Sequence, residues 1–195
     1  MLLFNGRDGM KTTLSNPARK LYMVLSPQAL SYATVALRSL FTSTAERLDL
    51  HLITDSTADT VTAYSYNLAG ALTEVGTPHP VGASPTGVAI DPTGSFLYVA
   101  NSGNGTVSTF TINSSTGALT AVGSAVSTGG GNSTSPTALL VEPSGQFLYV
   151  TNGDAATVST FGITPVTGVL SVIGTPQQAV GGLGGSGGSS ALAIE

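Results

Sequence analysis

Few side chains in this 195-residue sequence can act as an acid, a base or a nucleophile near neutral pH. It has two histidines, His51 and His79, and no cysteine, which excludes a thiolate nucleophile, a disulfide and a cysteine-ligated metal. His79 stands between two prolines, in a stretch typical of an exposed loop, whereas His51 stands in an apolar, strand-like run. Because hydrolysis needs a base that activates water, His79 is the one candidate base after residue 58.

The acidic residues fall in turn-forming sequences rather than in groups that suit a metal ion. Asp91 and Glu142 each open a four-residue stretch that continues with proline, then threonine or serine, then Gly94 or Gly145. An acid at the first position, proline at the second and glycine at the fourth favour a tight hairpin turn. We therefore interpret Asp91 and Glu142 as turn residues, and both glycines as suppliers of positive φ.

Serine is abundant, yet no Gly-x-Ser-x-Gly sequence stands between a strand and a helix, as a nucleophile elbow requires. The glycine-rich tract Val180–Ser190 lacks the strand-then-helix context of a phosphate-binding loop, and we interpret it as a flexible connection. The sequence therefore predicts no catalytic, cofactor-binding or metal-ligating residue, and no cofactor.

Charge is sparse and unevenly distributed, with only 8% of the residues charged. All six cations lie within the first 47 residues (Arg7, Lys11, Arg19, Lys20, Arg38, Arg47). Residues 59–195 carry six acids and no lysine or arginine. Nucleic-acid binding by this long part is excluded, because neutralising phosphates needs cations.

A repeat determines the expected fold. SPTGVAIDPTGSFLYVANSGNGTVSTFTINSSTGALTAVG begins at Ser84, and a similar unit, SPTALLVEPSGQFLYVTNGDAATVSTFGITPVTGVLSVIG, begins 51 residues later at Ser135. Asp59–Gly76 matches the second half of the unit, and Ser189–Glu195 matches its beginning. The sequence therefore predicts two full units between two partial ones, ending in mid-unit.

Each unit has the pattern of four strands, expected in the first unit at 86–90, 96–101, 107–113 and 118–123. Four antiparallel strands in about 50 residues are the period of a propeller blade. The predicted fold is mainly β: a partial β-propeller with two full four-stranded antiparallel blades plus partial blades, preceded by a short α/β segment.

The tetrapeptide Tyr149–Asn152 (YVTN) and its counterpart Tyr98–Asn101 (YVAN) resemble the YVTN family of β-propeller repeats over roughly residues 59–195. That family is similar to the seven-bladed lactonases, which include 6-phosphogluconolactonases. The resemblance implies a ring-shaped all-β fold. The aromatic residues around these tetrapeptides are expected to pack between blades (Phe96, Tyr98, Phe147, Tyr149).

The first 58 residues have a different pattern. Leu21–Leu25 predicts a strand, Ser26 and Pro27 predict a helix start, and the apolar spacing that follows predicts a helix within Pro27–Ser43. Leu48–Thr54 then predicts a second strand. Together these elements predict a β-α-β unit, the start of a parallel α/β sheet.

The stretch LYMVLSPQALSYATVALRSLFTSTAERLDLHLITDS (residues 21–56) resembles the opening of a family 8 glycosyltransferase. That resemblance implies a nucleotide-sugar donor site with an Asp-x-Asp metal motif. No Asp-x-Asp sequence occurs anywhere in the chain. Glycosyltransferase activity is therefore not carried over from the resemblance.

A second alignment leaves the start of the propeller part open. Leu50–Val61 superposes without gaps on Phe147–Val158. Leu50–Thr54 is thus either the second strand of the β-α-β unit or the second strand of a blade whose front half is replaced by the N-terminal segment. The expected organisation is an N-terminal tail (1–19), a β-α-β segment (20–58) and propeller repeats (59–195) that end in mid-blade.

Three functions from different classes follow. The first is a binding or structural module of a lactonase-like propeller, with no chemistry of its own. The second is a lactonase-like hydrolase of the 6-phosphogluconolactonase type, and the third is a glycosyltransferase fragment. The expected partners are a protein or a small-molecule ligand of unknown identity, together with self-association through open blade edges.

No apolar run reaches the ~18 residues of a membrane span, and the N-terminus is not that of a signal peptide. The sequence assigns neither a cytoplasmic nor an extracellular location.

Overall fold

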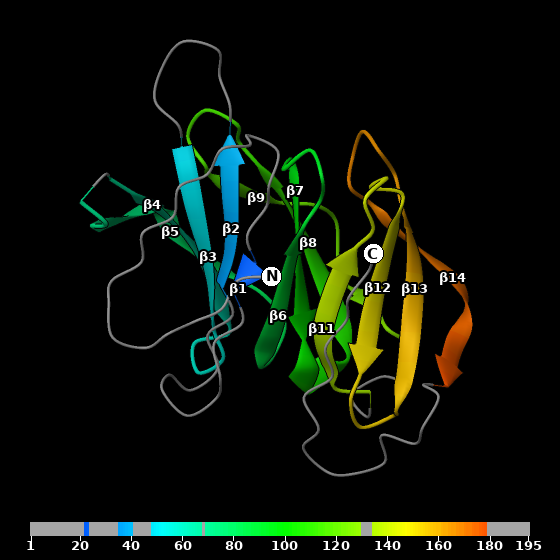
Figure 1. Ribbon diagram of the computed structural model, residues 1–195. Coiled ribbons are helices and arrows are strands. Elements are labelled where there is room, and N and C mark those ends of the chain that lie inside the picture. The colour runs from blue at the N-terminus through cyan, green and yellow to red at the C-terminus, as the bar shows by residue number, and fades with distance from the viewer. Residues whose placement is uncertain (1–21, 24–34, 41–47, 68, 130–133, 179–195) are drawn as a thin grey trace, which may run out of the picture.

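The computed structural model describes residues 22–23, 35–40, 48–67, 69–129 and 134–178. These residues form three antiparallel sheets that lie side by side (Figure 1). We call the sheets blades 1, 2 and 3 in chain order. Blade 1 contains β1 (Tyr22–Met23), β2 (Val35–Leu40), β3 (Leu48–Asp55), β4 (Thr60–Tyr66) and β5 (Leu72–Pro80).

Blades 2 and 3 are the two units of the sequence repeat. Blade 2 contains β6 (Pro85–Ile90), β7 (Phe96–Asn101), the 3₁₀ turn η1 (Ser102–Asn104), β8 (Thr106–Ile112), β9 (Leu119–Ala121) and β10 (Val126–Ser127). Blade 3 contains β11 (Pro136–Val141), β12 (Phe147–Asn152), β13 (Thr157–Ile163) and β14 (Leu170–Gln178). The predicted strands and their antiparallel order are confirmed, and the fold is a partial β-propeller.

The strand β6 of blade 2 lies between β2 of blade 1 and β11 of blade 3 (Figure 1). Blades 2 and 3 approach closely along these strands. Thr86 Oγ1 donates a hydrogen bond to the carbonyl oxygen of Pro136 at 2.8 Å. A Cβ on Gly87 would lie 2.8 Å from the carbonyl oxygen of Thr137, so only glycine allows this approach.

The outer strand of each blade contains a bulge that begins at a glycine of positive φ. In blade 1 the register shifts between Val61 and Ala63, and in blade 3 between Val158 and Thr160. In blade 2 the same interruption separates β9 from β10, both of which pair with β8. The bulge glycines are Gly76, Gly123 and Gly174, with φ values of 77°, 60° and 64°. A residue without a Cβ adopts this conformation at little cost.

The helix predicted within Pro27–Ser43 is wrong for the residues of that range that the structure describes. Val35–Leu40 is the strand β2, and it pairs antiparallel with β3 from Val35↔Ile53 to Leu40↔Leu48. A short helix has little intrinsic stability in water. The edge of β3 offers a row of backbone hydrogen-bonding groups, and pairing with that edge satisfies them. The parallel β-α-β unit that the glycosyltransferase resemblance implied is therefore not the observed arrangement of β2 and β3.

The strand β3 takes the place of a blade's second strand. It pairs with β4 from Leu50↔Ser65 to Asp55↔Thr60, in the antiparallel arrangement of β7 with β8 and β12 with β13. Of the two alternatives for Leu50–Thr54, the structure shows the second. Blade 1 takes its first strand from the N-terminal segment, so its sheet runs across residue 58.

Two apolar clusters hold the three blades together. Both use the alternation of a strand, which sends successive side chains to opposite faces of a sheet. The cluster between blades 1 and 2 contains Leu50, Leu52, Val61, Ala63, Val88, Ile90, Leu97, Val99, Phe110, Ile112 and Leu119. The cluster between blades 2 and 3 contains Ala89, Phe96, Tyr98, Val107, Val141, Leu148, Val150, Phe161, Ile163 and Leu170. Phe96 and Tyr98 pack between blades, as predicted.

Candidate functional site

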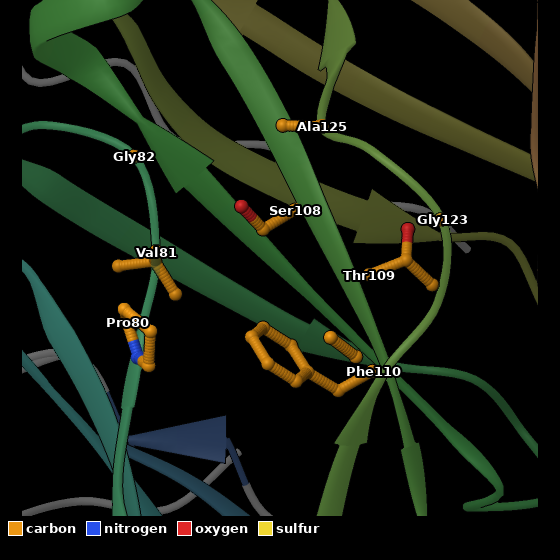
Figure 2. A pocket seen from close by; sticks show the side chains of 9 residues that line it. Pro80, Val81, Gly82, Ser108, Thr109, Phe110, Gly123 and Ala125 are labelled. Atoms are coloured by element: carbon orange, nitrogen blue, oxygen red, sulfur yellow. The ribbon is translucent and has the colours of Figure 1, made fainter.

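A cleft of about 250 Å³ opens between blades 1 and 2. One wall is the chain that leaves β5, at Pro80, Val81 and Gly82. The other walls come from blade 2: Ser108, Thr109 and Phe110 on β8, and Ala121, Gly123 and Ala125 at the bulge of the outer strand. Figure 2 shows the Phe110 ring between β8 and the segment at Pro80 and Val81, with the Ser108 hydroxyl further along β8.

The outer-strand bulge helps to form this cleft. The backbone N–H of Val122 donates to the carbonyl oxygen of Thr109 at 2.9 Å, and regular pairing resumes only at Val126↔Val107. The residues between these two points leave the ladder, which opens space beside Ser108. The cleft thus combines the aromatic ring of Phe110, the hydroxyl-bearing residues Ser108 and Thr109, and the backbone of Gly82 and Gly123. This chemistry suits binding of a small neutral molecule with both apolar and hydroxyl groups.

His79 lies beside the cleft but in a different environment from the one predicted. It belongs to β5, opposite Val61 in the register, and it is half-buried, so the expectation of an exposed loop is wrong. Its ring meets the ring of Phe110 edge to face, with centroids 5.9 Å apart and planes at 62°. The equivalent positions of the other blades are Val126 and Gln177, which pair with Val107 and Val158. The packing of His79 on an inter-blade aromatic ring is a structural role.

Asp91 has the turn role that the sequence predicts. Asp91 is 4% exposed. It accepts hydrogen bonds from the backbone N–H groups of Thr93, Ser95 and Phe96 at 2.9, 2.6 and 2.7 Å. Gly94, at the fourth turn position, has a φ of 74°, as predicted. The Asp91 charge also acts on Tyr98. The pKa of the Tyr98 phenol is raised well above its ordinary value, first by burial and second by this neighbouring carboxylate.

Glu142 holds the equivalent turn of blade 3. It accepts hydrogen bonds from the Ser144 hydroxyl and from the backbone N–H of Gln146, and Gly145 has a φ of 74°. The hydrogen bond from the Ser144 hydroxyl is the main cause that lowers the pKa of the Glu142 carboxyl below its usual value. Both acids are therefore engaged in turns.

Two asparagines have a role that the sequence analysis missed. Asn101 Nδ2 donates to Thr106 Oγ1 at 3.0 Å and to Ser108 Oγ at 2.9 Å. The repeat equivalents in blade 3 make the same bonds. Asn152 Nδ2 donates to Thr157 Oγ1 at 3.0 Å and to Ser159 Oγ at 2.7 Å. The last residue of each Tyr-Val-x-Asn tetrapeptide thus ties the second strand of its blade to the third. A sequence signal for this role exists, since threonine follows five and serine seven residues after each asparagine.

The asparagine of blade 2 also supports the cleft. Asn101 is fully buried, and its Oδ1 atom has no hydrogen-bond partner in the structure. Gly82 packs directly on it, because a Cβ at Gly82 would lie 2.7 Å from Asn101 Cβ and Cγ. Asn101 therefore positions Ser108 on one side of the cleft and the Gly82 backbone on the other.

The cations that would attract an anionic substrate lie mainly outside the described residues. Arg38 belongs to β2, and the other five are in the parts of the chain that the structure leaves undescribed. Within the described ranges, no group of three or more histidine, aspartate or glutamate side chains is placed to hold a metal ion. The same ranges contain no helix long and apolar enough to cross a membrane.

One family model matches the chain. The model of the family described as "Lactonase, 7-bladed beta-propeller" matches residues 57–182. No curated protein matches the sequence.

Among solved structures, the chain is similar to a putative 6-phosphogluconolactonase from Bacteroides uniformis (19% identity, TM-score 0.61, 80% of this chain and 45% of that one). It is also similar to a periplasmic gluconolactonase from Pseudomonas aeruginosa (21% identity, TM-score 0.58, 74% and 40%). A protein of unknown function from Desulfotomaculum acetoxidans is 25% identical (TM-score 0.56, 64% and 37%). The chain spans less than half the length of each of these three.

Proposed function

Because the chain belongs to the lactonase family of seven-bladed β-propellers, we propose that it is a binding and structural module of a lactonase-like propeller. In this proposal its blades provide packing faces and a small-molecule cleft, and the module has no chemistry of its own.

One observation carries the proposal: the titratable side chains that the sequence singled out are engaged in holding the fold. Asp91 and Glu142 accept the hydrogen bonds of two turns. His79 packs edge to face on Phe110 in the strand β5. Hydrolysis of a lactone requires a base placed beside a water molecule and donors placed for the developing oxyanion. The cleft offers the hydroxyls of Ser108 and Thr109, and hydroxyls of this kind bind a neutral ligand without activating water.

A second candidate function is lactone hydrolysis, with His79 as the base. It is supported by the position of His79 next to two residues of the cleft wall, Pro80 and Phe110. The names of two similar solved proteins, a putative 6-phosphogluconolactonase and a gluconolactonase, point in the same direction. Since those proteins are less than 25% identical to this chain, the likeness supports the fold rather than the reaction.

Lactone hydrolysis by the chain and by a His79→Gln variant distinguishes the two candidates. Glutamine is the matched replacement, because Gln177 occupies the equivalent position of blade 3. With gluconolactone and 6-phosphogluconolactone as substrates, we expect both proteins to show only the spontaneous rate. Saturable turnover by the parent chain that the variant loses would support the hydrolase and overturn the module.

Ligand binding in the cleft is measured separately. Titration with a neutral sugar lactone, monitored by the amide resonances of Gly82, Ser108 and Gly123, is expected to shift these resonances in the parent. A Ser108→Val variant removes one hydroxyl of the cleft and is expected to weaken the shift. Resonances that do not respond in the parent would contradict a binding role for this cleft.

A further inference from the structure

The cleft between blades 1 and 2 has a counterpart between blades 2 and 3. Val81 and Thr128 are equivalent, because the backbone N–H of each donates at 2.9 Å to the carbonyl oxygen of the residue just before β4 or β8, respectively. Gly82 follows Val81, and Gly129 follows Thr128. At each junction, the segment that leaves one blade therefore lies beside the outer strand of the next.

A proline ring bridges this space at the junction of blades 2 and 3. Pro176 belongs to β14 and stands two residues after the bulge glycine Gly174. A Cβ on Gly129 would lie 2.8 Å from Pro176 Cγ and 3.2 Å from Pro176 Cδ, so the ring packs directly on the Gly129 backbone. Pro176 is half-buried, whereas its two neighbours in β14 are exposed. The ring thus connects the outer strand of blade 3 to the segment that leaves blade 2.

Blade 2 has an alanine in place of this proline. Ala125 stands two residues after the bulge glycine Gly123, as Pro176 does after Gly174. Blade 1 has Pro78 at the same position, so alanine departs from the residue that the other two blades share. Ala125 lines the cleft from the side of blade 2, and Gly82 lines it from the segment that leaves β5 (Figure 2). The cleft of about 250 Å³ therefore includes the space that a proline ring takes at the next junction.

The two junctions also differ in a hydrogen bond. At the junction of blades 2 and 3, Ser159 Oγ donates to the carbonyl oxygen of Thr128 at 2.7 Å. Its equivalent in the cleft wall, Ser108, accepts a hydrogen bond from Asn101 Nδ2 at 2.9 Å. Ser108 Oγ donates to no residue in the described part of the chain. Because a serine hydroxyl has one donor, Ser108 can donate to a ligand that brings a carbonyl oxygen into the cleft.

We propose that the cleft binds an acylated proline ring, that is, a saturated five-membered ring whose nitrogen carries an acyl group. The ring lies beside Gly82 and Phe110, as the Pro176 ring lies beside Gly129, and the acyl oxygen accepts a hydrogen bond from the Ser108 hydroxyl. This inference rests on the binding role proposed above for the cleft, and it narrows the ligand from a neutral molecule to one ring chemistry.

The size and the chemistry of the cleft fit this ligand. Its volume of about 250 Å³ is below the roughly 300–1,000 Å³ of sites for drug-sized molecules, which suits a single ring with a small substituent. None of its lining residues is ionisable, so the zwitterion of free proline would lose hydration without gaining a charged partner. Phe110 supplies an aromatic ring, and aromatic-lined grooves are a common docking site for proline. The ligand is either a prolyl residue of a peptide or a small acylproline.

Titration with matched probes tests the ring chemistry and its source. The probes are acetylproline amide and acetyl-alanyl-prolyl-alanine amide, with acetyl-trialanine amide and free proline as controls. They are added to tens of millimolar, because ligands of this size bind at about the millimolar level. We expect both prolyl probes, and neither control, to shift the amide resonances of Gly82, Ser108 and Gly123 saturably.

The relative affinity of the two prolyl probes identifies the source of the ring. Tighter binding of the tripeptide supports a peptide ligand, and equal or weaker binding supports a small acylproline. Shifts from acetyl-trialanine amide as large as those from the prolyl tripeptide would overturn the proposal. The absence of a response to both prolyl probes would also overturn it.

A matched pair of variants in the bulge of blade 2 tests the location. Ala125→Pro introduces the residue that blade 3 has at Pro176, so the new ring should compete with the ligand and raise the Kd about tenfold or more. Ser124→Thr is the control, because it introduces the residue that blade 3 has at Thr175 and does not line the cleft. The control should bind like the parent. If Ala125→Pro bound the prolyl probes as tightly as Ser124→Thr, the proposed location would be wrong.

Two further variants keep the test valid if Ala125→Pro does not fold, which thermal melting reveals. Ala121→Val introduces the residue that blade 3 has at Val172 and narrows the cleft from β9, so it should also weaken binding. Ser108→Ala removes the donor to the acyl oxygen and should raise the Kd about two- to tenfold. Unchanged affinity in folded forms of both variants would overturn the proposal.

The neutral sugar lactone of the earlier titration separates this inference from the binding role on which it rests. Shifts with the lactone but not with the prolyl probes would retain a binding cleft and overturn the proline ring as its ligand. The absence of shifts with either would overturn both. Lactone turnover that His79→Gln loses would overturn the module, and titration of that variant with the prolyl probes would still decide whether the cleft binds the ring.

Discussion

The carboxylate of Asp59 accepts a hydrogen bond from the backbone N–H of Ser84 at 2.7 Å. Asp59 closes the turn between β3 and β4 of blade 1, and Ser84 is the last residue before β6 of blade 2. Both residues have positive φ, 54° and 50°. One side chain thus fixes the point at which the chain passes from blade 1 to blade 2.

Replacing Asp59 should weaken the connection between blade 1 and blade 2. Asp59→Ala removes the acceptor of the Ser84 N–H and places alanine at positive φ, whereas Asp59→Asn retains an acceptor and a residue that tolerates this conformation. We expect Asp59→Ala to lower the free energy of unfolding by about 1–3 kcal/mol, and Asp59→Asn by clearly less. Chemical denaturation measures both. Equal losses would mean that the hydrogen bond contributes nothing.

The equivalent turn of blade 3 should respond in the opposite sense. Ala156 has a φ of 50°, while the equivalent residue of blade 2 is Gly105, with a φ of 62°. Ala156→Gly relieves the contact between Cβ and backbone, so we expect the free energy of unfolding to rise by about 1 kcal/mol. A melting temperature below that of the parent would contradict this explanation.

Gly168 and Gly70 should differ sharply in their tolerance of a side chain. A Cβ at Gly168 meets the Phe96 ring at 2.3 Å, whereas a Cβ at Gly70 meets no atom of the described residues within 4 Å. Gly168→Asn should therefore lower the free energy of unfolding by about 1–3 kcal/mol, because packed inter-blade side chains must shift. Gly70→Asn should change the free energy of unfolding by much less. Thermal melting of the two variants gives this comparison.

The two buried asparagines should contribute to stability through the bonds that tie the second strand to the third. Asn152→Ala leaves Thr157 Oγ1 and Ser159 Oγ without the Asn152 donor. We expect a loss of about 1–3 kcal/mol in the free energy of unfolding, and a similar loss for Asn101→Ala. Asn152→Asp is the informative second variant, since it keeps the shape and removes the donor. If Asn152→Asp were as stable as the parent near neutral pH, the donor bonds would not account for the effect.

Acid should weaken the Glu142 turn. The folded-state pKa of Glu142 lies below its ordinary value of 4.5, so the ionised form is favoured in the folded chain. Stability from this group is present above the unfolded pKa and is lost as the pH falls through the lower folded pKa. Glu142→Gln should therefore flatten the dependence of stability on pH below about 4.5. Parallel curves for variant and parent over that range would show that the Ser144 hydrogen bond has no influence on the titration. Because Glu142 is only half-buried and remains accessible to water, the effect should be small.

Much of the fold is predictable because it is a repeat of local patterns. The turns at Asp91 and Glu142 follow from the hydrogen-bonding chemistry of four consecutive residues, and the glycine at the fourth position adopts the expected positive φ. The strands at Phe96–Asn101 and Phe147–Asn152 follow from aromatic and β-branched residues between turns. These turns and strands depend on neighbouring residues in the sequence, so the same pattern in both repeat units supports the same structure in each.

The environment of His79 was not predictable in the same way. Flanking prolines at Pro78 and Pro80 favour a loop, yet His79 pairs with Val61 and packs on Phe110 of the next blade. Its partners lie 18 and 31 residues away in the sequence, and no local pattern identifies them. The cleft beside it likewise depends on a bulge and on the spacing between two blades.

The repeat, the strand order within blades 2 and 3 and the turn chemistry are predictable from the amino-acid sequence, because they rest on contacts between near neighbours. The strand at Val35–Leu40 depends on tertiary contacts, since pairing with the edge of β3 outweighs the helical spacing of that segment. The tertiary structure also sets which of the repeated residues are buried by a neighbouring blade. Phe96 and Phe147 are equivalent in the sequence, yet Phe96 packs against Gly168 and is 6% exposed, whereas Phe147 is 37% exposed.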